Sequence, residues 1–306
     1  MSRYLARRML AAASTVWAVL TLIFIVVRVV PGDPAAILLG TFATPALLAE
    51  QRARLGLDRP LAEQYVHFLR QAASGDWGLS YFWGTSPLRL VSQAFPATLE
   101  LAVASLALTL VSSLVLGSLA AIWVGSAADR AIGTFSLVGQ AMPSFWLGIV
   151  AILLFAKDLR WLPSYGSGGV AHLVLPAVTL SVQYIGLTTR LVRAGVLETQ
   201  SRDFVRTARA KGASAARVIV HHIYRNMLIP VVTMTGLQMG NLIGGVVVTE
   251  TVFSWPGLGR LIIDAIGNRD YPVVQAAVTF TAVLFVLLNL SVDMTYGVLD
   301  PRIRYD

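Results

Sequence analysis

Six stretches of mostly apolar residues recur along the chain, and they constrain its fold more than any other feature. They lie at roughly 9–30, 97–124, 132–156, 172–197, 227–250 and 273–298. A helix needs about 20 such residues to cross the hydrocarbon core of a bilayer. A crossing segment must also satisfy its own backbone hydrogen bonds, which favours helices. The sequence therefore predicts an all-α, polytopic membrane protein with six transmembrane helices and with both termini on one side.

The basic residues predict the orientation of these helices. Fourteen of them fall on the side of the termini: Arg3, Arg7, Arg8, Arg130, Arg302, Arg304 and the eight from Arg190 to Arg225. The short loops on the other side hold four: Lys157, Arg160, Arg260 and Arg269. Because short cytoplasmic loops carry the excess of Lys and Arg, we expect both termini in the cytoplasm. The first apolar run exceeds the core of about 7–15 residues of a cleaved signal, so we expect it to be retained.

A long external loop, residues 31–96, carries signals for helices of its own. Thr44 is placed as an N-cap, Pro45 as the first helical residue and Gly56 as the stop. Asp58 repeats the N-cap pattern before a second helix. The apolar face expected for that helix comprises Leu61, Tyr65, Phe68 and Leu69. We thus expect three parts: the N-terminus and first transmembrane helix (1–30), an external helical loop (31–96), and a five-helix core (97–306) with a cytoplasmic loop at 198–226.

The composition excludes several classes of function. Only 13% of the residues are charged, and the net charge of +8 is explained by membrane orientation without any nucleic-acid partner. The chain has no cysteine, and its four histidines lack metal-binding spacing. No GxxxxGK[ST] phosphate loop and no GxSxG nucleophile elbow occurs. We therefore expect no catalytic residue, metal site or cofactor in this chain, so any uphill transport must be driven from outside it.

Glycines at Gly236, Gly240 and Gly244 recur at intervals of four in the fifth apolar run. Such a strip lies on one face of a helix and lets another backbone approach closely. We interpret it as a helix-packing face, with lining of a pore as the alternative.

Uncharged polar residues are the candidates for a translocation path: Gln183, Tyr184, Gln238 and Asn241. Hydrogen bonding between helices is an equally good interpretation of these four. Asp293 is the one acid within the runs that could serve an ion-coupled carrier, and its place near Arg302 and Arg304 suits an ion pair better. The scarcity of ionisable residues inside the runs therefore disfavours a self-sufficient secondary carrier.

The stretch "RDFVRTARAKGASAARVIVHH" (202–222) carries five Arg and Lys residues against one acid. At helical spacing, Phe204, Val205, Ala208 and Gly212 fall on one side, with Arg202, Arg206, Arg209 and Lys211 elsewhere. An amphipathic helix of this kind can lie in a groove of another protein. The alternative is a positively charged loop on anionic lipid.

Short motifs along nearly the whole chain make it resemble a known family. In order they are "PGDPA" (31–35), "LGLDRPLAEQY" (55–65), "GDWGLS" (75–80), "PATLELA" (96–102), "PSFWLG" (143–148), "RTARAKGAS" (206–214), "RNMLIPVV" (225–232), "ETVFSWPGLGRL" (250–261) and "LDPRIR" (299–304). Together they resemble the permeases of ABC importers, in the dipeptide, oligopeptide and nickel branch. The long external loop is similar to that of the first of the branch's two permeases.

Two positions depart from the pattern of the wider superfamily. The acidic first residue of its EAA triplet falls on Arg206, whereas its glycine matches Gly212. Its proline falls near Arg225, whereas this chain has Pro230. Both departures are shared by the peptide and nickel branch.

The resemblance implies a type I ABC importer permease fold in a bacterial cytoplasmic membrane. It also implies several partners: a homologous second permease, two ATPase subunits that hold ATP and Mg, an external solute-binding protein and membrane lipid. The segment from Asp203 to Ser214, with Phe204, Arg206, Ala208, Lys211 and Gly212, is then expected to be the coupling helix that docks on an ATPase. The expected substrates are di- or oligopeptides, with nickel or glutathione as variants of the same branch.

Overall fold

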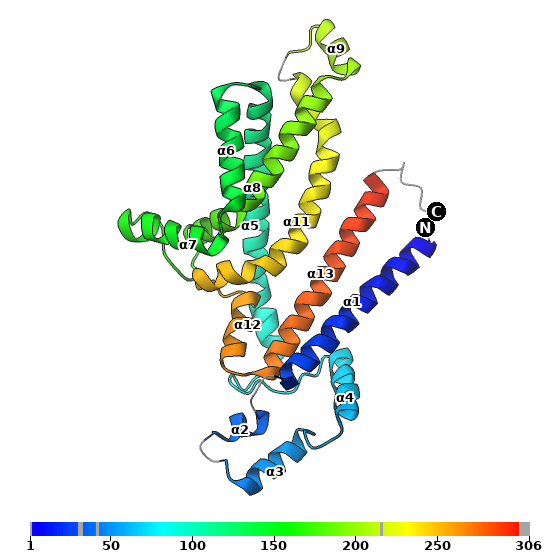
Figure 1. Cartoon of the computed structure of the whole chain (residues 1–306), viewed down its shortest axis with the longest axis vertical. Coiled ribbons are helices and arrows are strands. Elements are labelled where there is room, and N and C mark those ends of the chain that lie inside the picture. The colour runs from blue at the N-terminus through cyan, green and yellow to red at the C-terminus, as the bar shows by residue number, and fades with distance from the viewer. Residues whose placement is uncertain (1, 30–32, 41–42, 215–216, 300–306) are drawn as a thin grey trace. The chain divides into compact units, whose positions relative to one another are not determined.

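The computed structural model describes residues 2–29, 33–40, 43–214 and 217–299, and within these ranges the regular structure is helical throughout (Figure 1). The chain divides into two compact units. The first contains residues 1–98 and 256–290, and the second contains residues 99–255 with a short stretch that begins at residue 291.

Four helices are long and apolar enough to cross a membrane within the described ranges: Ala6–Val29, Pro87–Ile122, Val170–Gln200 and Tyr271–Val292. They belong to α1 (Ser2–Val29), α5 (Pro87–Ile122), α8 (Val170–Gln200) and α13 (Tyr271–Leu299). A bent pair of helices supplies a fifth crossing if it is counted as one. Several side chains of α11 (Arg225–Val252) lie outside the described residues, so the sixth crossing stays a prediction.

The apolar run that was expected to cross the membrane at 132–156 is interrupted by a bend in the structure. The structure has α6 (Ala127–Ala141), a break, and then α7 (Ser144–Ala151), which continues as a π-helix over Ile152–Asp158. The two arms are bent by 106°. The break falls at Met142 and Pro143, and Met142 is extended with ψ 130°. Proline disfavours helical conformation in the residue before it and cannot donate to the helix ladder.

The loop that was expected to be external contains three short helices of the first unit: α2 (Pro34–Leu39), α3 (Pro45–Arg54) and α4 (Leu61–Ser74). The predicted cap of α3 is confirmed, since the Thr44 side chain accepts a hydrogen bond from Leu47 N and Gly56 has φ +65°. Asp58 does not cap α4, because that helix begins at Leu61 directly after Pro60 and has no side-chain cap.

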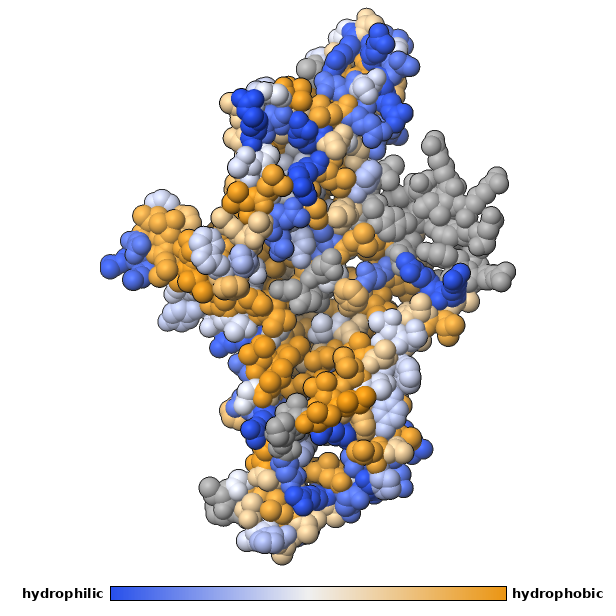
Figure 2. All heavy atoms as spheres, in the orientation of Figure 1, coloured by the Kyte–Doolittle hydropathy of each residue, from blue (hydrophilic) through white to orange (hydrophobic). Residues whose placement is uncertain are grey.

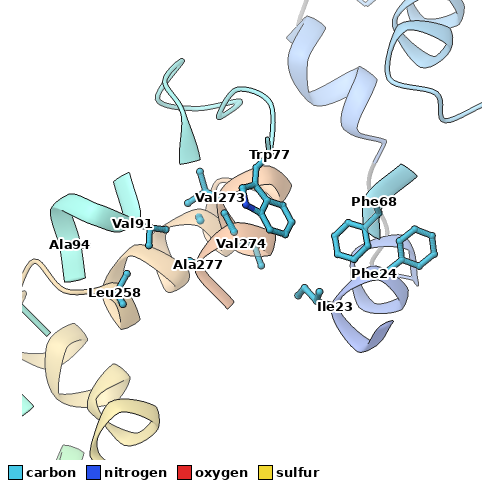
Figure 3. Packing of buried hydrophobic residues seen from close by; sticks show 12 residues of the cluster. Ile23, Phe24, Phe68, Trp77, Val91, Ala94, Leu258, Val273, Val274 and Ala277 are labelled. Carbon is cyan, nitrogen blue, oxygen red and sulfur yellow. The ribbon is translucent and has the colours of Figure 1, made fainter. Parts of the chain in front are cut away.

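The core of the first unit is built on aromatic contacts between α1 and α4 (Figure 3). Phe24 of α1 packs edge-on against Tyr65, at 5.0 Å between ring centroids, and lies 5.5 Å from Phe68. Phe68 in turn packs against Trp77. Leu61 was expected on this face but is 65% exposed, because α4 starts there and its first turn projects away from the core.

A buried acid, Asp270, fixes the N-terminus of α13 to the 80–83 loop of the same unit. Its carboxylate accepts hydrogen bonds from Ser80 Oγ, from Phe82 N at 3.0 Å and from Val273 N at 3.4 Å. Asp270 thus caps the N-terminus of α13. It also accepts hydrogen bonds from a loop that lies about 190 residues earlier in the sequence. A fully buried carboxylate needs several such donors to offset its desolvation.

In the second unit, glycines allow α5, α6 and α8 to approach closely. A Cβ added to Gly117 of α5 would lie 2.6 Å from the side chain of Val192, and one added to Gly139 would lie 2.9 Å from Val182. A Cβ on Gly186 of α8 would overlap the carbonyl of Ser136 on α6. Membrane helices gain mainly from van der Waals contact when they associate, so small residues at these points set the distance between the helices.

We predict that Gly186→Ala lowers stability strongly, because the Ser136 backbone cannot move aside as a flexible side chain can. Overpacking of this kind costs about 1–3 kcal/mol. Gly133→Ala is the matched control, since a Cβ on Gly133 of α6 meets nothing within 4 Å. The measurement is the apparent melting temperature of each purified variant in mild detergent. Equal melting temperatures for the two variants would contradict the close contact.

Candidate functional site

The segment between α8 and α11 contains α9 (Asp203–Ala210), which is shorter than the helix expected over Asp203–Ser214. Gly212 ends it, with φ +82°. Gly212 N donates to Arg209 O at 2.9 Å, and Ala213 N donates to Ala208 O at 3.1 Å. These two bonds form a Schellman motif, in which glycine takes the left-handed position just beyond the helix. Lys211 and Gly212 therefore belong to the turn after α9.

One face of α9 is buried within its own unit. Val205 is fully buried and Ala208 is 9% exposed. Both pack in an apolar cluster with residues from the end of α8, from the π-helix Val218–Tyr224 and from the start of α11. The cluster includes Val196, Val218, Ile223 and Met227. Helix α9 is thus held against the helices that precede and follow it.

Phe204 was expected on the apolar side with Val205 and Ala208, and this expectation is wrong. Its ring is 42% exposed. In a helix, successive residues point about 100° apart, so burial of the Val205–Ala208 line leaves Phe204 at the border of that face. An exposed aromatic ring at this place is available to another molecule.

Cations surround this ring, and hydrophilic residues gather about α9 at the top of Figure 2. Arg202 pairs with Glu198 at 2.6 Å, and Arg206 lies 3.9 Å from Asp203. All four of these side chains are more than half exposed, so each pair contributes little. Arg209 and Lys211 are exposed and have no ion pair among the residues that the structure describes. The outer face of α9 therefore combines one aromatic ring with positive charge.

The sequence analysis missed an ion pair in the helices behind α9. Arg193 of α8 donates to Asp129 of α6 through Nε at 2.7 Å and Nη2 at 2.8 Å. Asp129 also accepts from Gly125 N at 2.9 Å, in the turn before α6, and its own N donates to Ser126 Oγ. The pattern Ser126-x-x-Asp129 could have indicated the start of a helix, but nothing in the sequence pointed to Arg193. A bidentate pair of this kind fixes the C-terminal part of α8 to the start of α6.

The structure separates the four path candidates. Gln238 is 2% exposed, and its Nε2 donates to Thr188 Oγ1 at 2.9 Å, which is a hydrogen bond between α11 and α8. Gln183 is exposed on α8, and Tyr184 beside it is half-buried. Asn241 lies in α11, and its side chain is outside the described residues. Among the path candidates whose side chains the structure describes, Gln183 and Tyr184 keep a surface on which a solute could be contacted.

The structure describes the surroundings of two of the three glycines of α11, Gly236 and Gly240. A Cβ on Gly236 would lie 2.9 Å from Val292 of α13 in the same unit, and Gly240 is buried. The surroundings of Gly244 are outside the described residues, as is the side chain of Asp293.

Among the residues described, no three acids or histidines lie close enough together to hold a metal ion.

Comparisons with known proteins give the family. The model of the family described as "binding-protein-dependent transport system inner membrane component" matches residues 113–305, and the model of its N-terminal region matches residues 1–102. A probable peptide ABC transporter permease of Sinorhizobium fredii is 43% identical, over 100% of both chains. A glutathione transport system permease of Escherichia coli (strain K12) is 39% identical, again over 100% of both.

A solved structure of a methionine ABC transporter in an inward-facing conformation has the same fold. Its TM-score is 0.58 at 18% identity, and the match covers 70% of this chain and 97% of that one. The family models together span nearly the whole sequence. The chain belongs to the family of binding-protein-dependent transport system inner membrane components, and it is a permease subunit of an ABC importer rather than its ATPase.

Proposed function

We propose that this chain is one of two permeases that form the path of an ATP-driven importer for di- and oligopeptides. The observation that carries the proposal is the similarity at 43% identity, over the full length of both chains, to a probable peptide permease. Glutathione is a second candidate, because a glutathione permease is 39% identical over its full length. Glutathione is itself a short peptide, so both candidates belong to one chemical class.

The proposed assembly contains a homologous second permease, two ATPase subunits that bind ATP and Mg on the cytoplasmic side, and an external solute-binding protein. We place it in a bacterial cytoplasmic membrane, with six spans and both termini in the cytoplasm. The excess of basic residues on the side of the termini supports this orientation.

In this proposal α9 is the coupling helix. Its exposed ring, Phe204, and the surrounding cations dock in a groove of an ATPase, while Val205 and Ala208 bind it to its own chain. A helix that is packed on its own unit moves together with the ends of α8 and α11. Arg193 and Asp129 then extend this movement from α8 to α6.

The proposal is tested by purifying the tagged chain from its native membranes in mild detergent, identifying the proteins that accompany it, and assaying uptake after reconstitution. Recovery of a second permease and ATPases, with uptake of peptides that requires ATP, would support the importer. The same assay with glutathione and with chelated nickel distinguishes the substrates. Uptake without any ATPase would instead show an ion-coupled carrier.

We predict that Phe204→Asp greatly reduces the ATPase recovered with the permease, because it replaces the exposed ring of α9 with an anion. Phe82→Asp is the matched control, since Phe82 is 62% exposed in the external loop. The measurement is the ratio of ATPase to permease after affinity purification. Equal ratios for the two variants would remove α9 from the docking site.

We predict that Asp129→Asn weakens the coupling of ATP hydrolysis to uptake. The substitution keeps the size of the side chain and removes the charge that holds Arg193 through two charge-assisted hydrogen bonds, which are stronger than neutral ones. The measurement is the number of ATP molecules hydrolysed per peptide imported in proteoliposomes, with Asp264→Asn as the control on an exposed acid of α12 (Leu258–Gly267). An unchanged ratio would show that the pair has no part in coupling.

A further inference from the structure

A pocket of about 840 Å³ lies entirely within the first unit, in the external part of the chain. Its wall is formed by the end of α1, the turn 52–59, the inner face of α4, the loop 77–81 and the start of α13. Pockets that bind small molecules have volumes of about 300–1,000 Å³. The pocket is therefore of a size to enclose a short peptide or a part of one.

Arg28 of α1 is half-buried in the wall of this pocket, and its guanidinium is held in one orientation. Its Nε donates to Gln64 Oε1 at 3.1 Å, and its Nη1 lies 3.4 Å from Phe24 O. The guanidinium carbon lies 3.6 Å from the centroid of the Phe24 ring. No carboxylate pairs with Arg28 in the part of the chain that the structure describes. The two acceptors and the ring offset part of the desolvation of this half-buried cation, but they are neutral and leave its charge unbalanced.

Gln64 makes the arrangement rigid. It accepts from Arg28, and its Nε2 donates to Leu57 O at 3.2 Å and to Arg59 O at 2.8 Å. One amide side chain thus links α1, α4 and the turn 57–59. A pre-positioned guanidinium loses little conformational entropy when it binds a ligand.

The other charges of the pocket are paired more completely. Arg52 pairs with Asp33, and Arg54 with Glu50, each at 2.7 Å. Arg59 and Asp58 also line the pocket, but both are exposed at its rim. Arg28 is therefore the half-buried cation of the pocket that lacks an anionic partner among the described residues.

Tyr81, in the loop 77–81, gives the pocket a neutral hydrogen-bond donor. Burial, with a smaller contribution from Asp270, raises the pKa of Tyr81 to about 12. Its hydroxyl consequently stays protonated at every physiological pH and can donate to an anion. Trp77 and Tyr271 add aromatic surface to the lining.

We propose that this pocket is a binding site for a carboxylate group of a small peptide, with Arg28 as the residue that binds the anion. A guanidinium can form two parallel hydrogen bonds to a carboxylate. The proposal rests on the proposed function, since it takes the imported peptide as the source of the carboxylate. The site lies where α1 ends and α13 begins, between these helix ends and the loop 31–96, so it would hold the peptide before it enters the membrane path.

The test is peptide binding by the full-length chain in nanodiscs of phosphatidylcholine, which carry no net charge. The probes are alanyl-alanine and its C-terminal amide, and affinity is measured by calorimetry. We expect the amide to bind at least about tenfold more weakly, since tenfold corresponds to the loss of one good charged interaction. Arg28→Gln should abolish this preference, whereas Arg28→Lys should retain part of it.

Arg70→Gln is the matched control, because Arg70 is an exposed residue of α4 that does not line the pocket. Each variant is first checked for a single symmetric peak in size-exclusion chromatography. Equal binding of acid and amide by the unaltered chain, no binding of either, or a preference that survives Arg28→Gln would overturn the proposal. Loss of binding only after addition of the anionic lipid phosphatidylglycerol would assign Arg28 to a lipid phosphate and would also overturn it.

The proposed function is tested separately by ATP-dependent uptake in the reconstituted importer. If alanyl-alanine is taken up but the chain binds the acid and the amide equally, the proposed binding site would be wrong and the importer function would stand. If ATP-dependent uptake is absent but the chain still prefers the free carboxylate, the binding site would remain and the proposed importer function would be removed.

Discussion

The hydrocarbon core of a bilayer offers no hydrogen bonds, and the rest of this structure depends on that constraint. It makes the long apolar runs helical, because only a helix satisfies its own backbone within one segment. It also removes most of the hydrophobic gain that helices obtain when they associate in water. What then determines the packing of α5, α6 and α8 is how closely their backbones approach, and Gly117, Gly139 and Gly186 set that distance.

A few polar side chains form hydrogen bonds between segments that are distant in the sequence. Asp270 joins a loop to the start of α13, and the Asp129–Arg193 pair joins α6 to α8. Gln238 and Thr188 join α11 to α8 in the same way. Each of these contacts connects residues at least 50 positions apart in the sequence. Both carboxylates accept more than one hydrogen bond, so a single side chain joins two segments of the chain.

The sequence predicted the helical class, four of the membrane helices and the cap of α3 by Thr44, since each depends on residues that are close in the chain. It did not predict the bend at Pro143, because an apolar run indicates how long a membrane segment is and not whether its helix changes direction. The partners of Asp129 and Asp270 could not be found either, since pairing across 64 or 190 residues leaves no local pattern. Gly212 was assigned to the face of a helix, whereas its role is the left-handed turn that ends the helix.

The burial of Val205 and Ala208 has a consequence for the assembly of the transporter. Because α9 covers its apolar face with its own chain, Phe204 is the one large apolar side chain that this helix leaves exposed. The helix therefore needs no ATPase to shield its apolar face from water. In a permease that has not yet met its ATPases, α9 can thus already be folded.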